Sequence, residues 1–209
     1  MPEFGALLEG YRRFRNTEYH AHRRRWERLA GGQEPPVMII ACCDSRVDPA
    51  TIFDTEPGQA FILRNVANIV PPYEEGGGLH GASAAIEFGV LGLGLRHIVV
   101  MGHGACGGIK AALEGVDHGT SGYSFIEGWI AVLSEARDRV LAANLGDPQR
   151  ALEMEAVKTS LRNLRSFPFV AERENSHRLK LHGCYFAIAE GTLYLLDEAE
   201  GSFRPVATD

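Results

Sequence analysis

Three short runs of apolar residues constrain the fold of this chain more than any other feature of its sequence. They are residues 37–41 (VMIIA), 60–63 (AFIL) and 97–101 (HIVVM). Continuous runs of this length are typical of strands that a sheet buries on both faces. Between the second and third runs, apolar residues from Leu79 to Leu93 recur every three or four positions, which predicts a helix. Because strands that alternate with helices favour right-handed crossovers, we predict an α/β fold with a mostly parallel central sheet flanked by helices.

The two ends of the chain are predicted to add an arm and a hairpin to this sheet. Residues 1–32 are predicted to form a helical arm, because apolar residues recur at helical spacing up to a pair of glycines. Further helices are predicted over 126–140 and from an Asp-Pro start at 147 to 164. Two strand-like segments within 179–197 predict a hairpin at the edge of the sheet. No repeat or linker interrupts the pattern, so we expect a single domain over 1–209, with residues 33–209 as its metal-binding core.

Charge and composition exclude several classes of protein. The chain carries 21 Lys and Arg against 27 Asp and Glu, a net charge of −6, which argues against a main role in coating nucleic acid. The basic cluster Arg23-Arg24-Arg25-Trp26 fits a solvated helix face or a subunit-docking arm better than a nucleic-acid or membrane patch. The longest apolar run, 37–43, is too short to cross a bilayer, and no targeting segment is visible. We therefore expect a cytoplasmic protein with no nucleic-acid or membrane partner, whose cysteines are more often ligands or nucleophiles than disulfides.

Two motifs with cysteine and histidine follow two of the predicted strands. Cys42 comes directly after the first strand, and His103 and Cys106 come directly after the third. Because the carboxyl ends of neighbouring parallel strands meet at one sheet edge, we expect these side chains to lie within a few ångströms of one another. Two thiolates and an imidazole suit tetrahedral zinc, and three protein ligands leave the fourth position for water or substrate. The sequence therefore predicts one catalytic zinc ion per chain.

Asp44 and Arg46 follow Cys42 closely, and the residues alone leave two roles open for Asp44. Its carboxylate is placed either to fill the fourth position on the metal or to accept a hydrogen bond from metal-bound water. Arg46 is placed to hold that carboxylate bidentately and to keep it ionised. Taken alone, residues 44–46 would be interpreted as a surface turn with an ordinary ion pair. The neighbouring ligand motif instead favours a functional role for Asp44 and Arg46.

Other features near these motifs receive a structural interpretation. Cys43 is expected to point away from Cys42, and Cys184 is expected to be a small core residue. The glycine pattern from Gly102 to Gly107 matches a dinucleotide-binding fingerprint, but its interior His and Cys and the lack of a following acidic strand end favour a metal loop. The remaining histidines show no ligand spacing.

Taken together, these motifs resemble those of the beta-class carbonic anhydrases, in particular the plant-like members. The residues that carry the resemblance are Cys42-x-Asp44-Ser45-Arg46, Arg64-Asn65-Val66-Ala67-Asn68 and Gly102-His103-x-x-Cys106-Gly107-Gly108. The resemblance implies a zinc-dependent lyase that interconverts carbon dioxide and bicarbonate by attack of zinc-bound hydroxide. It places Cys42, His103 and Cys106 on the metal and gives Asp44 and Arg46 a catalytic role.

The resemblance also implies a substrate pocket and an assembly. It assigns contacts with substrate to Gln33, Phe61, Phe88 and Gly107. It implies a homodimer or a higher homo-oligomer, with the N-terminal helix lying across the partner and the active site at the dimer interface. Because Ile39 stands where members switched off by bicarbonate carry tryptophan, we expect Asp44 to pair with Arg46 and to leave the metal open.

Three residues depart from the pattern of the family, and two other functions compete with the main one. Phe88 replaces a tyrosine, Gly92 a histidine suggested to shuttle protons, and Gly104 a serine. A relative that hydrolyses carbon disulfide or carbonyl sulfide would use the same site. A non-catalytic zinc-binding or bicarbonate-sensing module is the third interpretation, and the retained Asp44, Arg46 and Gln33 count against it.

Overall fold

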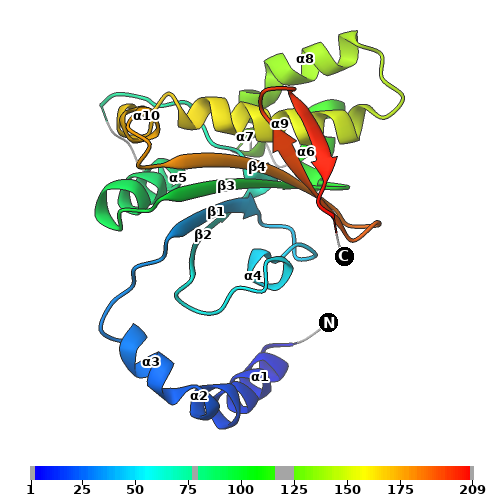
Figure 1. Ribbon diagram of the computed structural model, residues 1–209. Coiled ribbons are helices and arrows are strands. Elements are labelled where there is room, and N and C mark those ends of the chain that lie inside the picture. Colours follow the sequence, from blue (N-terminus) through cyan, green and yellow to red (C-terminus); the bar gives the residue numbers. More distant parts are fainter. Residues whose placement is uncertain (1–2, 77–79, 116–124, 208–209) are drawn as a thin grey trace. The chain divides into compact units, whose positions relative to one another are not determined.

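A computed structural model describes residues 3–76, 80–115 and 125–207 (Figure 1). Its contacts divide the chain into two compact units, Met1–Glu34 and Pro35–Asp209. Leu79, which was expected to begin the apolar pattern of a helix, lies outside the described residues. His118, one of the histidines without ligand spacing, lies outside them as well. Within the described residues, no helix is both long and apolar enough to cross a membrane.

The N-terminal unit is helical, as expected, but the helix is broken twice. Its described residues form α1 (Phe4–Asn16), α2 (Glu18–Ala21) and α3 (Arg23–Leu29). The breaks fall at Thr17, with φ −114° and ψ −83°, and at His22, with φ −113° and ψ 27°. In one continuous helix, positions 14 and 26 would lie about 18 Å apart along the axis. The breaks instead bring the ring centroids of Phe14 and Trp26 to 5.5 Å, so aromatic packing explains why helical spacing alone gave the wrong shape.

The second unit contains the predicted sheet. Its described residues form strands in the order β2-β1-β3-β4-β5-β6. Strands β2, β1, β3 and β4 run parallel to one another. Strand β5 runs antiparallel to β4, and β6 runs antiparallel to β5. These pairings confirm a mostly parallel sheet. Their bounds are β1 Val37–Cys42, β2 Ala60–Asn65, β3 His97–His103, β4 Lys180–Ala187, β5 Thr192–Asp197 and β6 Ser202–Pro205. The expected hairpin is β4 and β5, but β6, which the sequence did not predict, extends the edge by one further strand.

Helices cover this sheet on both faces, with α9 and α10 on one face and α4 on the other, and α8 packs on α9 (Figure 1). Asp147 caps α9 through the Arg150 N–H, and Pro148 begins the helix, as expected. The predicted helix over 126–140 is interrupted by a 3-10 turn, and α10 was not predicted. The bounds are α4 Pro49–Ile52, η1 Val66–Asn68, α5 Gly81–Glu87, η2 Phe88–Gly92, α6 Gly107–Glu114, α7 Phe125–Ile130, η3 Ala131–Leu133, α8 Ser134–Ala142, α9 Pro148–Leu164 and α10 Pro168–Asn175.

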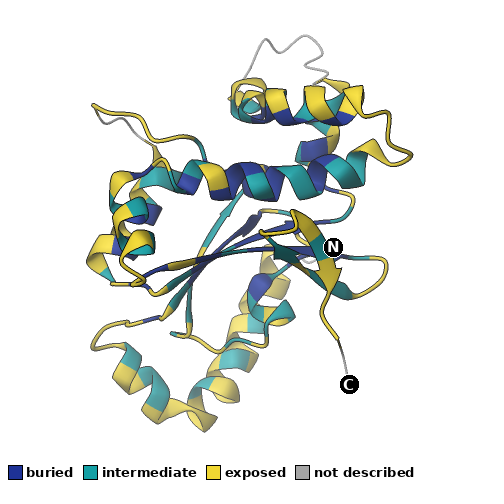
Figure 2. Cartoon of the chain, turned by 45° about the horizontal axis from the view of Figure 1, so that its top comes forward, coloured by how far each residue is buried: buried dark blue, intermediate teal, exposed yellow. Residues whose placement is uncertain are grey.

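The long helix α9 packs closely on the middle of the sheet (Figure 2). Ile98 and Val100 of β3 are fully buried in one cluster with Val157 of α9. Two strand glycines permit this approach, because a Cβ atom at Gly102 would lie 2.7 Å from Val157 and one at Gly183 would lie 2.9 Å from it. The close packing fixes the carboxyl end of β3, where His103 lies.

Candidate metal centre

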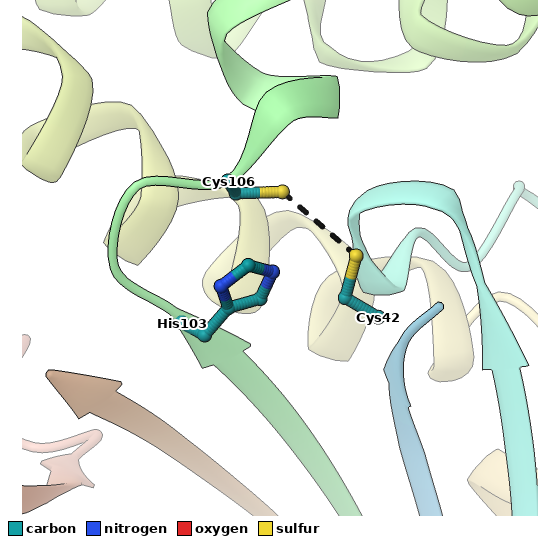
Figure 3. Close-up of side chains that lie close together, drawn as sticks. All are labelled: Cys42, His103 and Cys106. Carbon is teal, nitrogen blue, oxygen red and sulfur yellow. Dashed lines mark hydrogen bonds between the residues drawn. The ribbon is translucent and has the colours of Figure 1, made fainter. Parts of the chain in front are cut away.

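Three potential ligands meet at the carboxyl ends of β1 and β3 (Figure 3). Cys42 is the last residue of β1 and His103 the last residue of β3, while Cys106 immediately precedes α6. The parallel pairing of Ala41 with Met101 brings these strand ends to the same edge of the sheet. Cys42 is 5% exposed, and His103 and Cys106 are 1% exposed. The spatial grouping expected from the sequence is therefore present in a site enclosed by protein.

The geometry of this group fits a tetrahedral metal ion. The three ligand atoms lie within 4.8 Å of one another. The two sulfur atoms are 3.9 Å apart. A tetrahedral ion with metal–sulfur bonds of about 2.3 Å would hold its sulfurs about 3.8 Å apart. His103 Nδ1 bonds to the carbonyl oxygen of Gly104 at 2.9 Å, which leaves Nε2 as the free nitrogen.

That free nitrogen is the clearest sign that these residues bind a ligand. His103 Nε2 is buried and has no hydrogen-bond partner among the described residues. A buried polar atom without a partner costs free energy, so such atoms are rare unless a ligand satisfies them. Together with two adjacent thiols, the orphaned nitrogen supports the assignment of a soft or borderline cation to this site.

The two thiols are close enough for one to donate a hydrogen bond to the other. The hydrogen bond with Cys106 lowers the pKa of Cys42 far below that of an ordinary thiol. The same bond, followed by burial, raises the pKa of Cys106. Burial works to lower the pKa of His103, but the neighbouring Cys42 sulfur outweighs it and the pKa is raised. Because metal ligands must be deprotonated, binding of a cation would release protons from this group.

Asp44 and Arg46 form a close ion pair beside the three ligands. Arg46 Nε donates to Asp44 Oδ1 at 2.9 Å, and Nη2 donates to Oδ2 at 2.6 Å. The hydrogen bonds from Arg46 hold the pKa of Asp44 well below its usual range. Asp44 Oδ2 also lies 4.0 Å from His103 Nε2. An ionised carboxylate that only accepts hydrogen bonds therefore lies beside the Nε2 atom of His103.

The backbone around Cys42 is held by residues to which the sequence analysis gave no individual role. Ala67, with φ 61°, directs its N–H at the Cys42 sulfur at 3.4 Å. Arg64 donates to the carbonyl oxygens of Cys42 and Asp44 at 2.9 and 2.7 Å. Both belong to the Arg64–Asn68 motif, so the signal was present, but its function as a brace needed the fold. A Cβ at Gly108 would meet Val66 Cγ1 at 2.7 Å, which explains glycine there.

The predicted substrate residues are not all brought to the ligands. Gly107 follows Cys106 directly at the start of α6. Phe61 and Phe88 lie together, with ring centroids 6.0 Å apart, but Phe61 pairs with Met38, whereas Asn65 pairs with Cys42. Phe61 stands four positions before Asn65 on the strand, which corresponds to about 13 Å. Gln33 belongs to the N-terminal unit.

The two remaining cysteines take the places expected for them. Cys43 is exposed, and Cys184 is buried in the core, where burial raises its pKa to about 12. Neither belongs to the candidate metal group found among the described residues. Glu153, in contrast, was not expected near the site: it is 3% exposed and accepts a hydrogen bond from the Cys106 N–H.

Comparisons with known proteins agree with this geometry. A family model described as carbonic anhydrase matches residues 37–193. Beta carbonic anhydrase 3 of Arabidopsis thaliana is 36% identical over 194 residues, which cover 90% of this chain and 75% of that protein. Beta carbonic anhydrase 5, chloroplastic, of the same plant is 35% identical; the match covers 90% of this chain, and the chain spans 63% of that protein.

Solved structures are similar over nearly the whole chain. The beta-carbonic anhydrase CcaA superposes with a TM-score of 0.87 at 33% identity, over 97% of this chain and 91% of that one. One of two tetrameric beta-carbonic anhydrases from Sordaria macrospora superposes with a TM-score of 0.79 at 28% identity, over 98% of both chains. From the fold, the grouped ligands and these likenesses, we conclude that the chain belongs to the beta-carbonic anhydrase family.

Proposed function

We propose that this protein uses one zinc ion per chain to interconvert carbon dioxide and bicarbonate. The observation that carries the proposal is the buried group of Cys42, His103 and Cys106, with its orphaned His103 Nε2, beside the ionised Asp44. Zinc held by three ligands would lower the pKa of a water molecule and so supply a nucleophile near neutral pH. Family membership supports this reaction and this metal over other uses of the same donor set.

The residues of the chain would hold and orient the reactants. Because Asp44 is ionised, it can accept a hydrogen bond from the reacting water but cannot donate one, which fixes the direction in which a lone pair of that water points. Through its two bonds to the carboxylate, Arg46 would keep Asp44 ionised and hold it back from direct coordination of the metal. The Asp44–Arg46 pairing is consistent with the open arrangement expected from Ile39 and supports it as part of this proposal.

The substrate pocket and the assembly form part of the same proposal. Gln33, Phe61, Phe88 and Gly107 would line the pocket for carbon dioxide. Phe61 lies about 13 Å along β2 from the level of Cys42 in the same chain, and the ring of Phe88 lies beside it. This separation favours a homodimer or larger homo-oligomer in which a second copy brings such rings to the ligands. The Sordaria macrospora relatives are tetrameric, which supports assembly.

The cytoplasmic location also stays a proposal. One Arabidopsis relative is named as chloroplastic, so the family is not confined to one compartment. The four cysteines, which form no disulfide and two of which belong to the candidate metal group, are consistent with a reducing compartment.

Stopped-flow hydration of carbon dioxide, combined with elemental analysis of the same preparation, tests the function. We expect one zinc per chain and hydration well above the uncatalysed rate. A protein that holds zinc but hydrates carbon dioxide at background rate would instead be a zinc-binding or bicarbonate-sensing module. Preferential turnover of carbonyl sulfide or carbon disulfide would show that the site serves sulfur analogues.

A further inference from the structure

We propose that Glu153 is a positioning residue that holds the ligand Cys106 through the peptide bond between Ala105 and Cys106. The proposal rests on the metal site proposed above but not on the reaction. Cys106 N–H donates to Glu153 Oε1 at 2.9 Å. Glu153 lies in the second turn of α9, 47 residues further along the chain, and is 3% exposed. A carboxylate this deeply buried is retained only where it makes specific hydrogen bonds.

The other end of the same peptide is held by Arg46. Its Nη2 atom donates to the carbonyl oxygen of Ala105 at 2.9 Å. Ala105 has φ 53°, in the left-handed region that residues other than glycine rarely adopt. Such a conformation persists where the surroundings fix it. Rotation of the Ala105–Cys106 peptide would break the hydrogen bond to Glu153 and the charge-assisted hydrogen bond from the Arg46 guanidinium.

Glu153 is itself fixed from two sides. The Tyr185 hydroxyl, on β4, donates to Oε2 at 3.0 Å, and Gln149 Nε2 donates to Oε1 at 3.1 Å. A Cβ at Gly104 would lie 3.1 Å from the Tyr185 hydroxyl, so the glycine leaves room for this bond. The carboxylate therefore accepts three hydrogen bonds and is a rigid acceptor. Two elements that carry no ligand, α9 and β4, thus determine where the Cys106 sulfur lies.

The rate at which the protein releases its metal measures this effect directly. Partners that orient ligands typically change metal affinity by about 10- to 100-fold when they are removed. We therefore compare the transfer of zinc from the loaded protein to a chromophoric chelator in the wild type, Glu153→Ala and Glu153→Gln. Glu155→Ala is the matched control, because Glu155 lies on the same helix but pairs with Lys158 at 2.7 Å, away from the ligands.

We expect Glu153→Ala to release zinc about 10-fold faster or more. Glu153→Gln keeps an acceptor oxygen for the Cys106 N–H and should release zinc at nearly the wild-type rate, as should Glu155→Ala. In cobalt-loaded protein, the sulfur-to-metal charge-transfer band should change in Glu153→Ala and return in Glu153→Gln, which a merely structural role would not produce. The proposal would be overturned if Glu153→Ala released zinc at the wild-type rate. It would also be overturned if Glu153→Gln released zinc as fast as Glu153→Ala.

Tyr185→Phe keeps the test decisive if Glu153→Ala does not fold. It removes one hydroxyl and keeps the ring, over which the Arg150 guanidinium lies at 5.5 Å. We expect zinc release faster than in the wild type, and an unchanged rate would contradict the positioning role. A wild-type protein that binds no zinc would overturn the metal site as well. Zinc binding without hydration would overturn only the proposed reaction.

Discussion

Replacing Asp44 by asparagine removes the charge of the carboxylate beside the ligands while keeping its size. The amide nitrogen cannot accept a hydrogen bond, so one of the two bonds from the Arg46 guanidinium, at 2.9 and 2.6 Å, must be lost. A hydrogen bond to a charged group contributes about 1.5–3 kcal/mol. Because the Arg46 side chain is 50% exposed, screening by solvent reduces the expected loss of folding free energy to about 1 kcal/mol.

Turnover should fall by much more than this loss of stability suggests. If the amide oxygen of residue 44 takes the place of Oδ1, its NH₂ group takes the place of Oδ2 beside His103 Nε2 and donates where the carboxylate accepted. We expect a decrease in turnover of about 10- to 100-fold. This decrease corresponds to about 1.4–2.8 kcal/mol of activation free energy. Metal content should not change, because Asp44 is not one of the proposed ligands.

Stopped-flow hydration, elemental analysis and thermal unfolding of one preparation separate these effects. Asp138→Asn is the matched control: Arg137 donates to Asp138 Oδ1 at 2.9 and 2.8 Å, but this pair lies on α8, far from the ligands in the sequence. We expect its turnover to match the wild type. Wild-type turnover in Asp44→Asn would refute the role given to the carboxylate, and loss of metal in that variant would show that Asp44 is a ligand.

Three further predictions concern the same region. Cys106→Ser should lose the metal, because a hydroxyl is a poor substitute for a thiolate, and a full metal content by elemental analysis would contradict the ligand set. Gly108→Ala should lower the free energy of unfolding by about 1–3 kcal/mol in a urea titration, because its Cβ would lie 2.7 Å from Val66 Cγ1; an unchanged midpoint would show that the loop yields freely. Since Arg46 lowers the pKa of Asp44, the pair's contribution to stability should be complete above the unfolded pKa of about 3.9 and be lost as the pH falls through the folded value. In acid unfolding, Asp44→Asn should not show the loss of stability that the wild type shows when Asp44 is protonated. If the stability of the two proteins fell identically below about pH 4, the pair would not form in solution.

The parts of the fold that could be predicted are those that a local pattern determines. The runs that became β1, β2 and β3 were found because strands buried on both faces need continuous apolar residues. Strand β6 was missed because Ser202–Pro205 is four residues long and mostly exposed, so no apolar pattern marks it. The breaks at Thr17 and His22 depend on packing between aromatic rings distant in the sequence, which helical periodicity does not report.

The residues of the candidate site also fall into those that a local pattern predicts and those that it does not. Cys42, His103 and Cys106 could be grouped in advance because each follows a strand end, and parallel strands end at one edge. Glu153 could not, because nothing local distinguishes it from Glu155 on the same helix, which is partly exposed and pairs with a lysine. The separation of Phe61 from the ligands could have been foreseen, since it stands near the start of its strand.

X-ray absorption at the zinc edge of the purified protein reports the metal and its ligand atoms together. We expect one zinc per chain, with two sulfur neighbours at about 2.3 Å and two nitrogen or oxygen neighbours at about 2.0–2.1 Å, one of them from outside the chain. A shell of four sulfurs, a shell without sulfur, or a folded protein that binds no zinc would contradict it.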